Sequence, residues 1–294
     1  KVDFFKRQGR SLAYNNARLE SDSTIITSDT LTNLSFEKKS IASGNVRIES
    51  LNNNTIIYGN YLENYEKTNY TKITGNARLI QTEEGKDTMF IYSRMMEAFR
   101  NDPDYYNATD SVEVIRGDFS SKSGLSTYYA DSEKVSLSIE PIVWQNESQM
   151  TGDSIYAELP GKQLQTIYIR KLETLPSSKY SFVVSQNAEF EFYDRYNQVK
   201  GIDITMHFQD DKINFVDVTG SSQSIYYLFE NQKANGVNRA EGKNMRIQFD
   251  EEEQVSKIII QEDPVGQYIP EIKIPGEDLI LPGFNFREDK PQQR

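Results

Sequence analysis

A short pattern returns along this chain at a nearly constant interval. Ile41-Ala42-Ser43-Gly44-Asn45-Val46-Arg47-Ile48 is repeated as Ile73-Thr74-Gly75-Asn76-Ala77-Arg78-Leu79, with the two glycines 31 positions apart. A weaker copy spans residues 107–114 and has Asp110 in place of the glycine. A second element precedes each copy and begins at Ile26, Ile57 and Ile91. A repeat of this length is one supersecondary unit, which must stack on its neighbours to bury an apolar face.

Within each copy, apolar and polar residues alternate. Ala42, Gly44, Val46 and Ile48 fall on one face of an extended segment, and the residues between them are mostly polar. A period of two is typical of strands with one buried and one solvated face. Polar turns separate the alternating runs, and no 3.6-residue stripe of helical length is present. The sequence therefore predicts an all-β fold of antiparallel strands, stacked as strand-turn-strand repeats.

The pattern changes around Leu175-Pro176-Ser177-Ser178, which we interpret as a soft boundary. Further strands are expected at residues 181–184, 188–193, 201–208, 213–218, 224–228, 244–249 and 255–260. Prolines at 264, 270, 275 and 282 predict an extended surface tail, with residues 287–294 disordered. We expect a repeat domain at 1–175, a second β segment at 176–262 and a Pro-rich tail at 263–294.

Composition excludes several classes of function. The formal net charge is −11 and no long Lys/Arg run occurs, which argues against a nucleic-acid partner. The chain has no cysteine, which excludes disulfides, thiol catalysis and cysteine-ligated zinc. No G-x-G-x-x-G segment, P-loop or G-x-S-x-G nucleophile motif is present. We therefore expect no cofactor, no metal and no enzymatic activity.

The paired elements resemble the repeats of the OstA-like family of Gram-negative bacteria. The resemblance is carried by Thr27-Ser28-Asp29-Thr30-Leu31 with Ala42-Ser43-Gly44-Asn45-Val46-Arg47-Ile48, and by Gly59-Asn60-Tyr61-Leu62 with Thr74-Gly75-Asn76-Ala77-Arg78-Leu79. Residues 235–247 and 281–287 also look like stretches of the longer Bacteroidetes-type members.

The resemblance implies a fold, a function and a place in the cell. The family fold is a β-jellyroll shaped like a folded taco, in one or two stacked segments, with a hydrophobic inner groove. The implied function is non-catalytic binding of lipopolysaccharide or a related lipid in the periplasm, in association with the outer membrane. The implied partners are other envelope-transport proteins, which would join the exposed edge strands, and further copies of the chain, which would associate head to tail.

Two sets of site residues follow from the alternation and the resemblance. Arg47 and Arg78 recur at one repeat position, with Arg116 near the third, and are candidates for lipid-phosphate contacts. The alternative for these arginines is a solvated strand face with cross-strand ion pairs. The alternative for the inward set is an ordinary closed core without a ligand. The predicted lipid-groove lining is Ile26, Leu31, Val46, Ile48, Ile57, Leu62, Ile73, Ala77, Leu79, Ile91, Met96, Val112 and Val114.

Other polar residues are explained better by structure than by chemistry. His207 is the only histidine and is expected on a strand, and residues 250–253 (Asp-Glu-Glu-Glu) are expected at a hairpin tip. Asp29, Asp110 and Asp153 recur at repeat positions, as turn chemistry predicts. Two competing functions remain open: a structural or adhesive β-solenoid that binds proteins or glycans, with exposed aromatic rows, and a carbohydrate-active enzyme on a β-helix, with clustered carboxylates.

Overall fold

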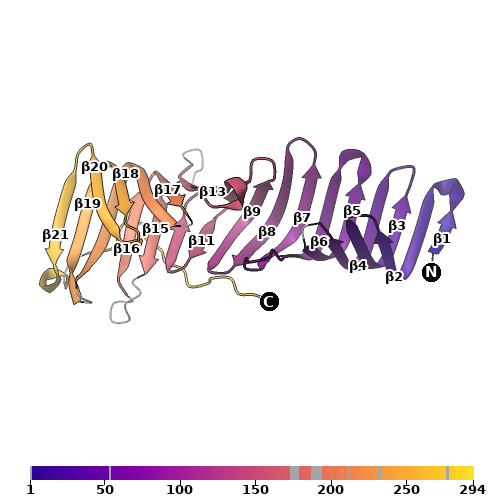
Figure 1. Cartoon of the computed structure of the whole chain (residues 1–294), viewed down its shortest axis with the longest axis horizontal. Coiled ribbons are helices and arrows are strands. Elements are labelled where there is room, and N and C mark those ends of the chain that lie inside the picture. Colours follow the sequence, from indigo (N-terminus) through magenta and orange to yellow (C-terminus); the bar gives the residue numbers. More distant parts are fainter. Residues whose placement is uncertain are drawn as a thin grey trace. The chain divides into compact units, whose positions relative to one another are not determined.

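The structure is a computed structural model that describes residues 2–52, 54–172, 179–186, 194–210, 212–230, 233–275 and 278–294. Every regular element in these ranges is a β-strand or a short 3-10 helix. The strand pairs are antiparallel, so the predicted all-β class, a jellyroll of strand-turn-strand repeats, is confirmed. The chain forms two compact units. Unit 1 is Lys1–Glu133 with Pro291–Arg294, and its strands run from indigo to magenta in Figure 1. Unit 2 is Lys134–Lys290, and its strands run from magenta to yellow.

Unit 1 is a meander in which each strand pairs with the next along the chain. Two 3-10 helices, η1 (Lys6–Gln8) and η2 (Glu66–Thr68), close turns between strands. The strands are β1 (Val2–Phe5), β2 (Arg10–Glu20), β3 (Thr24–Leu34), β4 (Lys39–Ser50), β5 (Thr55–Tyr65), β6 (Tyr70–Gln81), β7 (Met89–Arg100), β8 (Asp104–Arg116) and β9 (Phe119–Tyr129).

A bulge interrupts every pairing from β2 to β9 near the middle of the strands. At this point β4 has Gly44 at φ +75 and Asn45 at φ +45, and β6 has Gly75 at φ +83 and Asn76 at φ +54. Two successive left-handed residues add local twist and bend a strand. β2, β4, β6 and β8 have such a pair and are bent into two halves there. Their neighbours pair with both halves across the bulge, so the long strands of unit 1 contribute to two facing walls.

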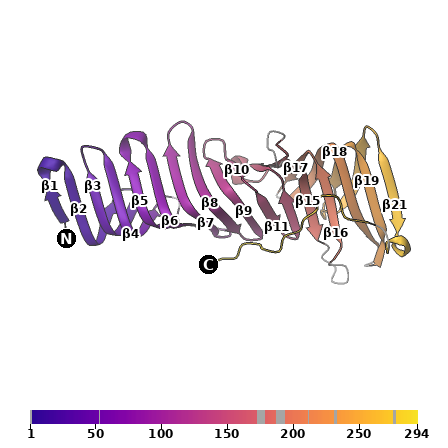
Figure 2. The same ribbon diagram turned by 180° about the vertical axis from the view of Figure 1, so that it is seen from behind.

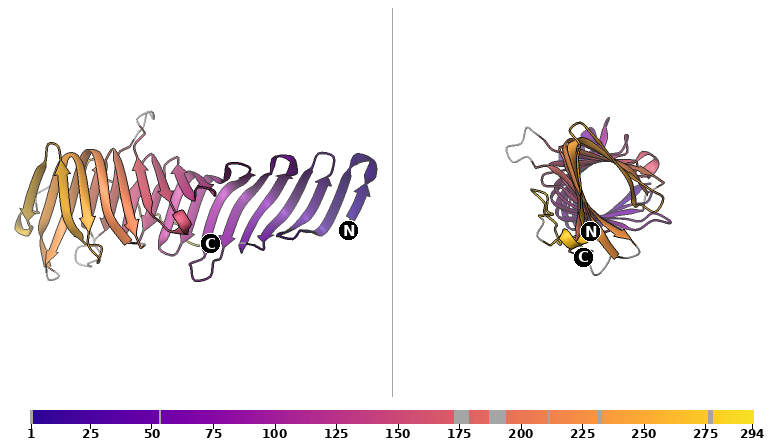
Figure 3. Two further views of the ribbon diagram at one scale, coloured as in Figure 1. Left: turned by 45° about the horizontal axis from the view of Figure 1, so that its top comes forward. Right: turned by 90° about the vertical axis from the view of Figure 1, so that its left-hand side faces the viewer.

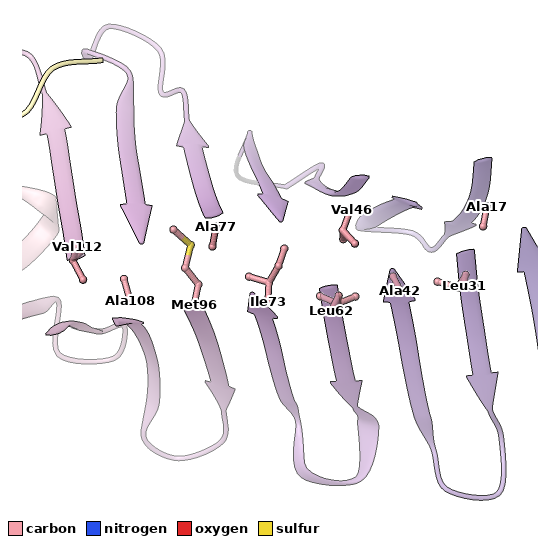
Figure 4. Packing of buried hydrophobic residues seen from close by; sticks show 10 residues of the cluster. All are labelled: Ala17, Leu31, Ala42, Val46, Leu62, Ile73, Ala77, Met96, Ala108 and Val112. Atoms are coloured by element: carbon pink, nitrogen blue, oxygen red, sulfur yellow. The ribbon is translucent and has the colours of Figure 1, made fainter. Parts of the chain in front are cut away.

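The inner residues of the two walls meet in one core. Ala17, Val46, Ala77 and Val112 come from one set of strand halves, and the other buried members of the cluster come from the opposite set (Figure 4). All are at most 8% exposed. The cluster consists of Ala17, Leu31, Ala42, Val46, Leu62, Ile73, Ala77, Met96, Ala108 and Val112.

Unit 2 contains shorter strands and two long ones. Its described residues include the 3-10 helices η3 (Pro160–Lys162) and η5 (Glu271–Lys273). Its strands are β10 (Lys134–Ser138), β11 (Ile142–Gln145), β12 (Ser148–Thr151), β13 (Ser154–Glu158), β14 (Thr166–Arg170), β15 (Ser181–Gln186), β16 (Tyr196–Gly201), β17 (Asp203–Gln209), β18 (Lys212–Glu230), β19 (Lys233–Phe249), β20 (Val255–Gln261) and β21 (Val265–Pro270).

The two long strands of unit 2 take part in both of its walls. One wall is β10, β13, β14 and β17, continued by the first half of β18, the second half of β19, and β20. The other is β11, β12, β15 and β16, continued by the second half of β18, the first half of β19, and β21. The right-hand view of Figure 3 shows the strands of unit 2 curving around a central axis.

The structure differs from the predicted elements in three places. Residues 213–218 and 224–228 were expected as two strands and are parts of the single strand β18, which bends at Gly220. The extended tail expected from residue 263 is wrong at its start, because β21 pairs with β19 and η5 follows it, whereas residues 278–294 have no regular secondary structure, as expected. The expected disorder of residues 287–294 is wrong, because the Arg287 N–H donates to Gln149 and Arg294 bonds to Tyr92.

The division into compact units does not test the predicted domain limits. The compact units divide the chain between Glu133 and Lys134. The proposed boundary at residues 175–178 and the expected strand at 188–193 lie outside the described residues. The division by resemblance into 1–175, 176–262 and 263–294 stays a prediction.

Candidate functional site

The predicted lining residues all lie in or against the unit 1 core. Leu31, Val46, Leu62, Ile73, Ala77, Met96 and Val112 are buried members of the cluster. Ile26, Ile48, Ile57, Leu79, Ile91 and Val114 are partly buried and pack against it. The alternation that selected these residues therefore identifies one continuous apolar inner face, although their role in binding a lipid stays a prediction.

The partly buried members form a single cross-strand row. Ile26 pairs with Ile48, Ile48 with Ile57, and Ile57 with Leu79. The row continues through Ile91 to Val114. An apolar row across six strands that keeps part of its surface exposed is the feature of this inner face that can accept an apolar ligand, because covering it removes that surface from water.

The opposite wall of unit 1 is polar at the corresponding distance from the bend. Asn33 pairs with Ser40, Ser40 with Asn64, and Asn64 with Thr71. The Thr71 hydroxyl donates to Asn64 Oδ1 at 2.8 Å, and Arg100 donates to the Thr71 hydroxyl at 2.7 Å. The inner face is therefore amphipathic from β3 to β6: one wall continues outward as aliphatic side chains and the other as amides and hydroxyls. From β7 to β9 the same row of the second wall continues as Ala98, Tyr106 and Tyr128.

Arg47 and Arg78 lie on the outer face of the first wall. They alternate along their strands with the inward residues Val46 and Ala77, and both pair with Tyr58 across the sheet. Arg47 donates to Glu49 at 2.6 Å, which raises the pKa of its guanidinium, and Arg78 stacks over the Tyr58 ring at 4.6 Å. The Arg47–Glu49 pair lies within β4 and the Arg78–Tyr58 contact crosses to β5, so neither is the cross-strand ion pair of the alternative. A phosphate contact stays a prediction.

A ladder of aromatic rings runs along the outer face of the second wall. Successive ring centroids are 5.7, 4.9, 4.5 and 6.1 Å apart. Lys39 extends the ladder, because its Nζ lies 4.6 Å from the Tyr65 ring. The ladder consists of Tyr65, Tyr70, Phe99, Tyr105 and Tyr129, on β5 to β9.

Acidic side chains lie beside this ladder and accept hydrogen bonds from its hydroxyl groups. Glu63 accepts from Lys39 at 2.7 Å, Tyr61 at 3.0 Å and Tyr65 at 3.2 Å, and these bonds, led by that of Lys39, lower its pKa. Tyr70 donates to Glu97 at 2.5 Å, and burial followed by this bond raises the pKa of the Tyr70 hydroxyl. Glu63 and Glu97 are therefore engaged in hydrogen bonds along the ladder and are not free to act as general acids or bases.

Unit 2 has an apolar inner row that sequence reasoning missed. Leu137 pairs with Ile155, Ile155 with Ile169, and Ile169 with Ile204. The row continues through Val218 and Met245 to Ile260. Its members from Leu137 to Met245 are at most 4% exposed. The alternation at Ile167 and Ile169, and at Ile204 and Met206, is the signal that could have found it.

The remaining candidate residues have structural partners. His207 stacks on Phe215 at 4.2 Å on β17. Asp29 accepts from Asn45 at 3.0 Å, Asp110 pairs with Arg94 at 3.2 Å, and Asp153 accepts from the Leu172 N–H at 2.8 Å. Asp250 accepts from backbone N–H groups of its own hairpin tip.

No group of three or more His, Asp or Glu side chains that could hold a metal ion occurs in the described ranges. Within the same ranges, no helix has the length and apolar character needed to cross a membrane.

Exposed apolar side chains gather on the terminal strands of both units. In unit 1, Val2 is 51% and Phe4 is 73% exposed on β1. In unit 2, Val265 is 61% and Tyr268 is 50% exposed on β21, and Ile272 in η5 is 88% exposed. Edge strands with exposed apolar residues are templates for pairing with a further strand.

Comparison with known proteins gave one distant structural similarity to report. No protein-family model and no curated protein matches the chain. Among solved structures it is similar to LptH of Pseudomonas aeruginosa, the LptA-homologous periplasmic component of a lipopolysaccharide transport device. The TM-score is 0.33 at 14% sequence identity, and the similarity covers 45% of this chain and 84% of the LptH chain.

Proposed function

We propose that this chain is a non-catalytic scaffold that binds lipid acyl chains along the inner face of unit 1. The observation that carries the proposal is the partly exposed row Ile26, Ile48, Ile57, Leu79, Ile91 and Val114, which borders a fully buried core. Each methylene that such a row removes from water contributes about 0.8 kcal/mol. A row across six strands can follow an extended acyl chain over much of its length.

The nature of the lipid and its compartment come from the resemblance of the repeats to the OstA-like family. On that basis the ligand is lipopolysaccharide or a related lipid, and the chain works in the periplasm, near the outer membrane. The sequence contains no nucleotide-binding motif, so the scaffold would take its lipid from, and pass it to, other proteins.

Partners would join the scaffold through its terminal strands. β1 and β21 carry exposed apolar side chains, which strand addition from a neighbouring protein would cover. The partner is another envelope-transport protein, or a second copy of this chain arranged head to tail.

The aromatic ladder bears on the competing glycan-binding function, which predicts exposed aromatic rows. Phe99 and Tyr105 are stacked, 13° from parallel, and the other three ring pairs are in contact with their rings tilted by 34° to 40°. Ring faces in such a stack are occupied by neighbouring rings, so they are not open for stacking with a sugar. The ladder therefore supports the sheet, and the lipid proposal is the stronger one.

Photocrosslinking tests the proposal with purified lipopolysaccharide as the probe. A photoreactive amino acid is placed at Ile57 or Leu79 on the inner face, and at Ile56 or Ile80 as matched controls. The control residues are neighbouring isoleucines of intermediate exposure whose side chains point to the opposite face. We expect labelling from positions 57 and 79 only. Equal labelling from both sets, or labelling from the controls alone, would overturn the proposal.

A further inference from the structure

The C-terminal segment lies across the outer face of one wall of unit 2. Figure 2 shows it passing β16 and β15 on its way to the C-terminus. The residues beneath it alternate with Val143, Met150, Val183 and Val199, which pair with one another on the inner face. The segment therefore covers the side of this wall that faces away from the interior of unit 2.

One cross-strand row forms the floor under the segment. Gln198 of β16 pairs with Val184 of β15, Val184 with Gln149 of β12, and Gln149 with Trp144 of β11. All four side chains are at most 3% exposed. The segment runs along this row and so crosses the strands instead of extending the sheet.

Two buried glutamines form the same pair of hydrogen bonds with the main chain of the segment. Gln198 donates to the Leu279 carbonyl and accepts from the Leu281 N–H, both at 2.9 Å. Gln149 donates to the Asn285 carbonyl at 2.6 Å and accepts from the Arg287 N–H at 2.7 Å. Each amide thus bonds the carbonyl of one residue and the N–H two residues later, as a neighbouring strand would.

Two further donors complete the hydrogen bonding. Lys200 Nζ donates to the Pro282 carbonyl at 2.9 Å, and Trp144 Nε1 donates to the Arg287 carbonyl at 3.1 Å. Burial lowers the pKa of Lys200, which is consistent with its position beneath the segment. Four side chains therefore make six hydrogen bonds with the main chain of residues 279–287.

Apolar anchors add side-chain specificity. Leu279 and Leu281 are 7% and 1% exposed and belong to a cluster with Phe182, Val184, Ile225, Tyr227, Val237 and Ile269. Phe284 and Phe286 pack on Tyr196, with ring centroids 5.3 and 4.9 Å away. The site therefore selects a peptide with paired leucines followed by paired phenylalanines.

We propose that this face is a peptide-binding site, and that the segment 279–287 of a second copy of this chain can occupy it in place of the chain's own. The contacts come from strands 81 to 143 residues away in sequence, so recognition does not depend on a covalent link to the segment. A vacated site would expose its apolar cluster to water, which favours replacement by a complementary segment. Exchange of an identical element between copies is a low-cost route to a closed dimer. The proposal is independent of lipid binding.

Two complementary full-length variants test the exchange. L281D keeps the binding site but cannot dock its own segment. The double variant Q149A/Q198A keeps the segment but lacks the two glutamine side chains that bind its main chain. Both are made with Phe4→Lys on β1, which removes association through that edge strand, and we expect each alone to be monomeric by native mass spectrometry. Mixing them should give a 1:1 complex, in which the intact segment of the second occupies the intact site of the first. Two separate monomers after mixing, with both variants folded by circular dichroism, would overturn the proposal.

The only tryptophan reports on the site directly. Trp144 lies under the segment, so its emission should shift to the red in L281D. A synthetic peptide of residues 278–290 should reverse the shift saturably, whereas the same peptide with Leu281→Asp should need on the order of tenfold more or fail. Equal reversal by both peptides would count against a specific site. If L281D does not fold, the full chain with Phe284→Ser and Phe286→Ser serves as the acceptor.

Discussion

The pair of left-handed residues at the bends of β2, β4, β6 and β8 explains why glycine recurs in the repeats. Gly44-Asn45, Gly75-Asn76 and Asp110-Ser111 all have positive φ, as do Asn15-Asn16 on β2. Asn and Asp tolerate this conformation better than other side chains. Asp110 therefore replaces the glycine of the third copy without loss of the bend, and Asn15-Asn16-Ala17-Arg18-Leu19 is an earlier copy that the sequence pattern did not reveal.

Gly44→Ala should destabilise unit 1 more than a left-handed φ alone explains. An added Cβ would lie 2.2 Å from Asp29 Oδ2, so the carboxylate must move away from its bond with Asn45. Gly85 is the matched control, because it also has φ +75 but nothing lies within 4 Å of its Cβ position. We expect Gly85→Ala to cost about 1 kcal/mol and Gly44→Ala about 2–3 kcal/mol in urea unfolding. Equal costs would show that Asp29 does not restrict the bend.

Glu63 should make the stability of unit 1 depend on pH in the acid range. Its pKa lies below the ordinary value of 4.5, chiefly because Lys39 donates to it. As the pH falls, the unfolded chain takes up the proton first. The stabilisation is therefore complete above pH 4.5 and is lost as the pH falls through the lowered pKa of the folded state. In Glu63→Gln, the unfolding free energy measured by urea titration should vary less with pH over this range. An unchanged slope would contradict the assignment.

At the scale of elements, the aromatic ladder ties five consecutive strands together at their turn ends. Cross-strand aromatic pairs contribute about 0.2–1 kcal/mol each relative to alanine pairs. The four pairs of the ladder follow the strand register, so they also oppose a slip of one strand against the next. The ladder thus supports the wall whose other face carries Leu62, Ile73 and Met96.

Phe99→Ala should therefore lower the unfolding free energy of unit 1 by about 1–3 kcal/mol, since Phe99 takes part in two of the four ring pairs. Tyr129→Ala removes a terminal ring with one such pair, and we expect it to cost about half as much. Thermal or urea unfolding measures both variants. If the two substitutions cost the same, the rings act as separate surface residues instead of a ladder.

At the scale of the whole molecule, the proposed association of copies depends on the terminal strands. Phe4 on β1 is 73% exposed. Phe36 is the matched control, because it is 70% exposed but lies in a turn and not on an edge strand. Phe4→Lys should abolish concentration-dependent self-association in sedimentation velocity, because a charge on an edge strand blocks strand addition. Phe36→Lys should leave it unchanged. Loss of association in both variants would point to general surface hydrophobicity.

Much of the fold and of the inner face could be predicted from the local pattern. The period of two assigns residues to faces whatever the strand packs against, so all thirteen predicted lining residues, from Ile26 to Val114, share one core. The same alternation places Arg47 and Arg78 on the opposite face, yet the sequence alone does not say which partners meet them there. Tyr58 was found only once the strands were paired, whereas Glu49 lies two residues after Arg47 on the same face of β4.

The sequence by itself determined the fold class, the length of the repeat and the inward face of unit 1, because these follow from backbone geometry and from contacts within one hairpin. Only the tertiary structure decided which strands share two walls, as β18 and β19 do, and what covers an outward face. Gln149 and Gln198 look like ordinary polar strand residues along the chain. They are buried because a segment more than 80 residues away lies across them, and such long-range contacts leave no local pattern.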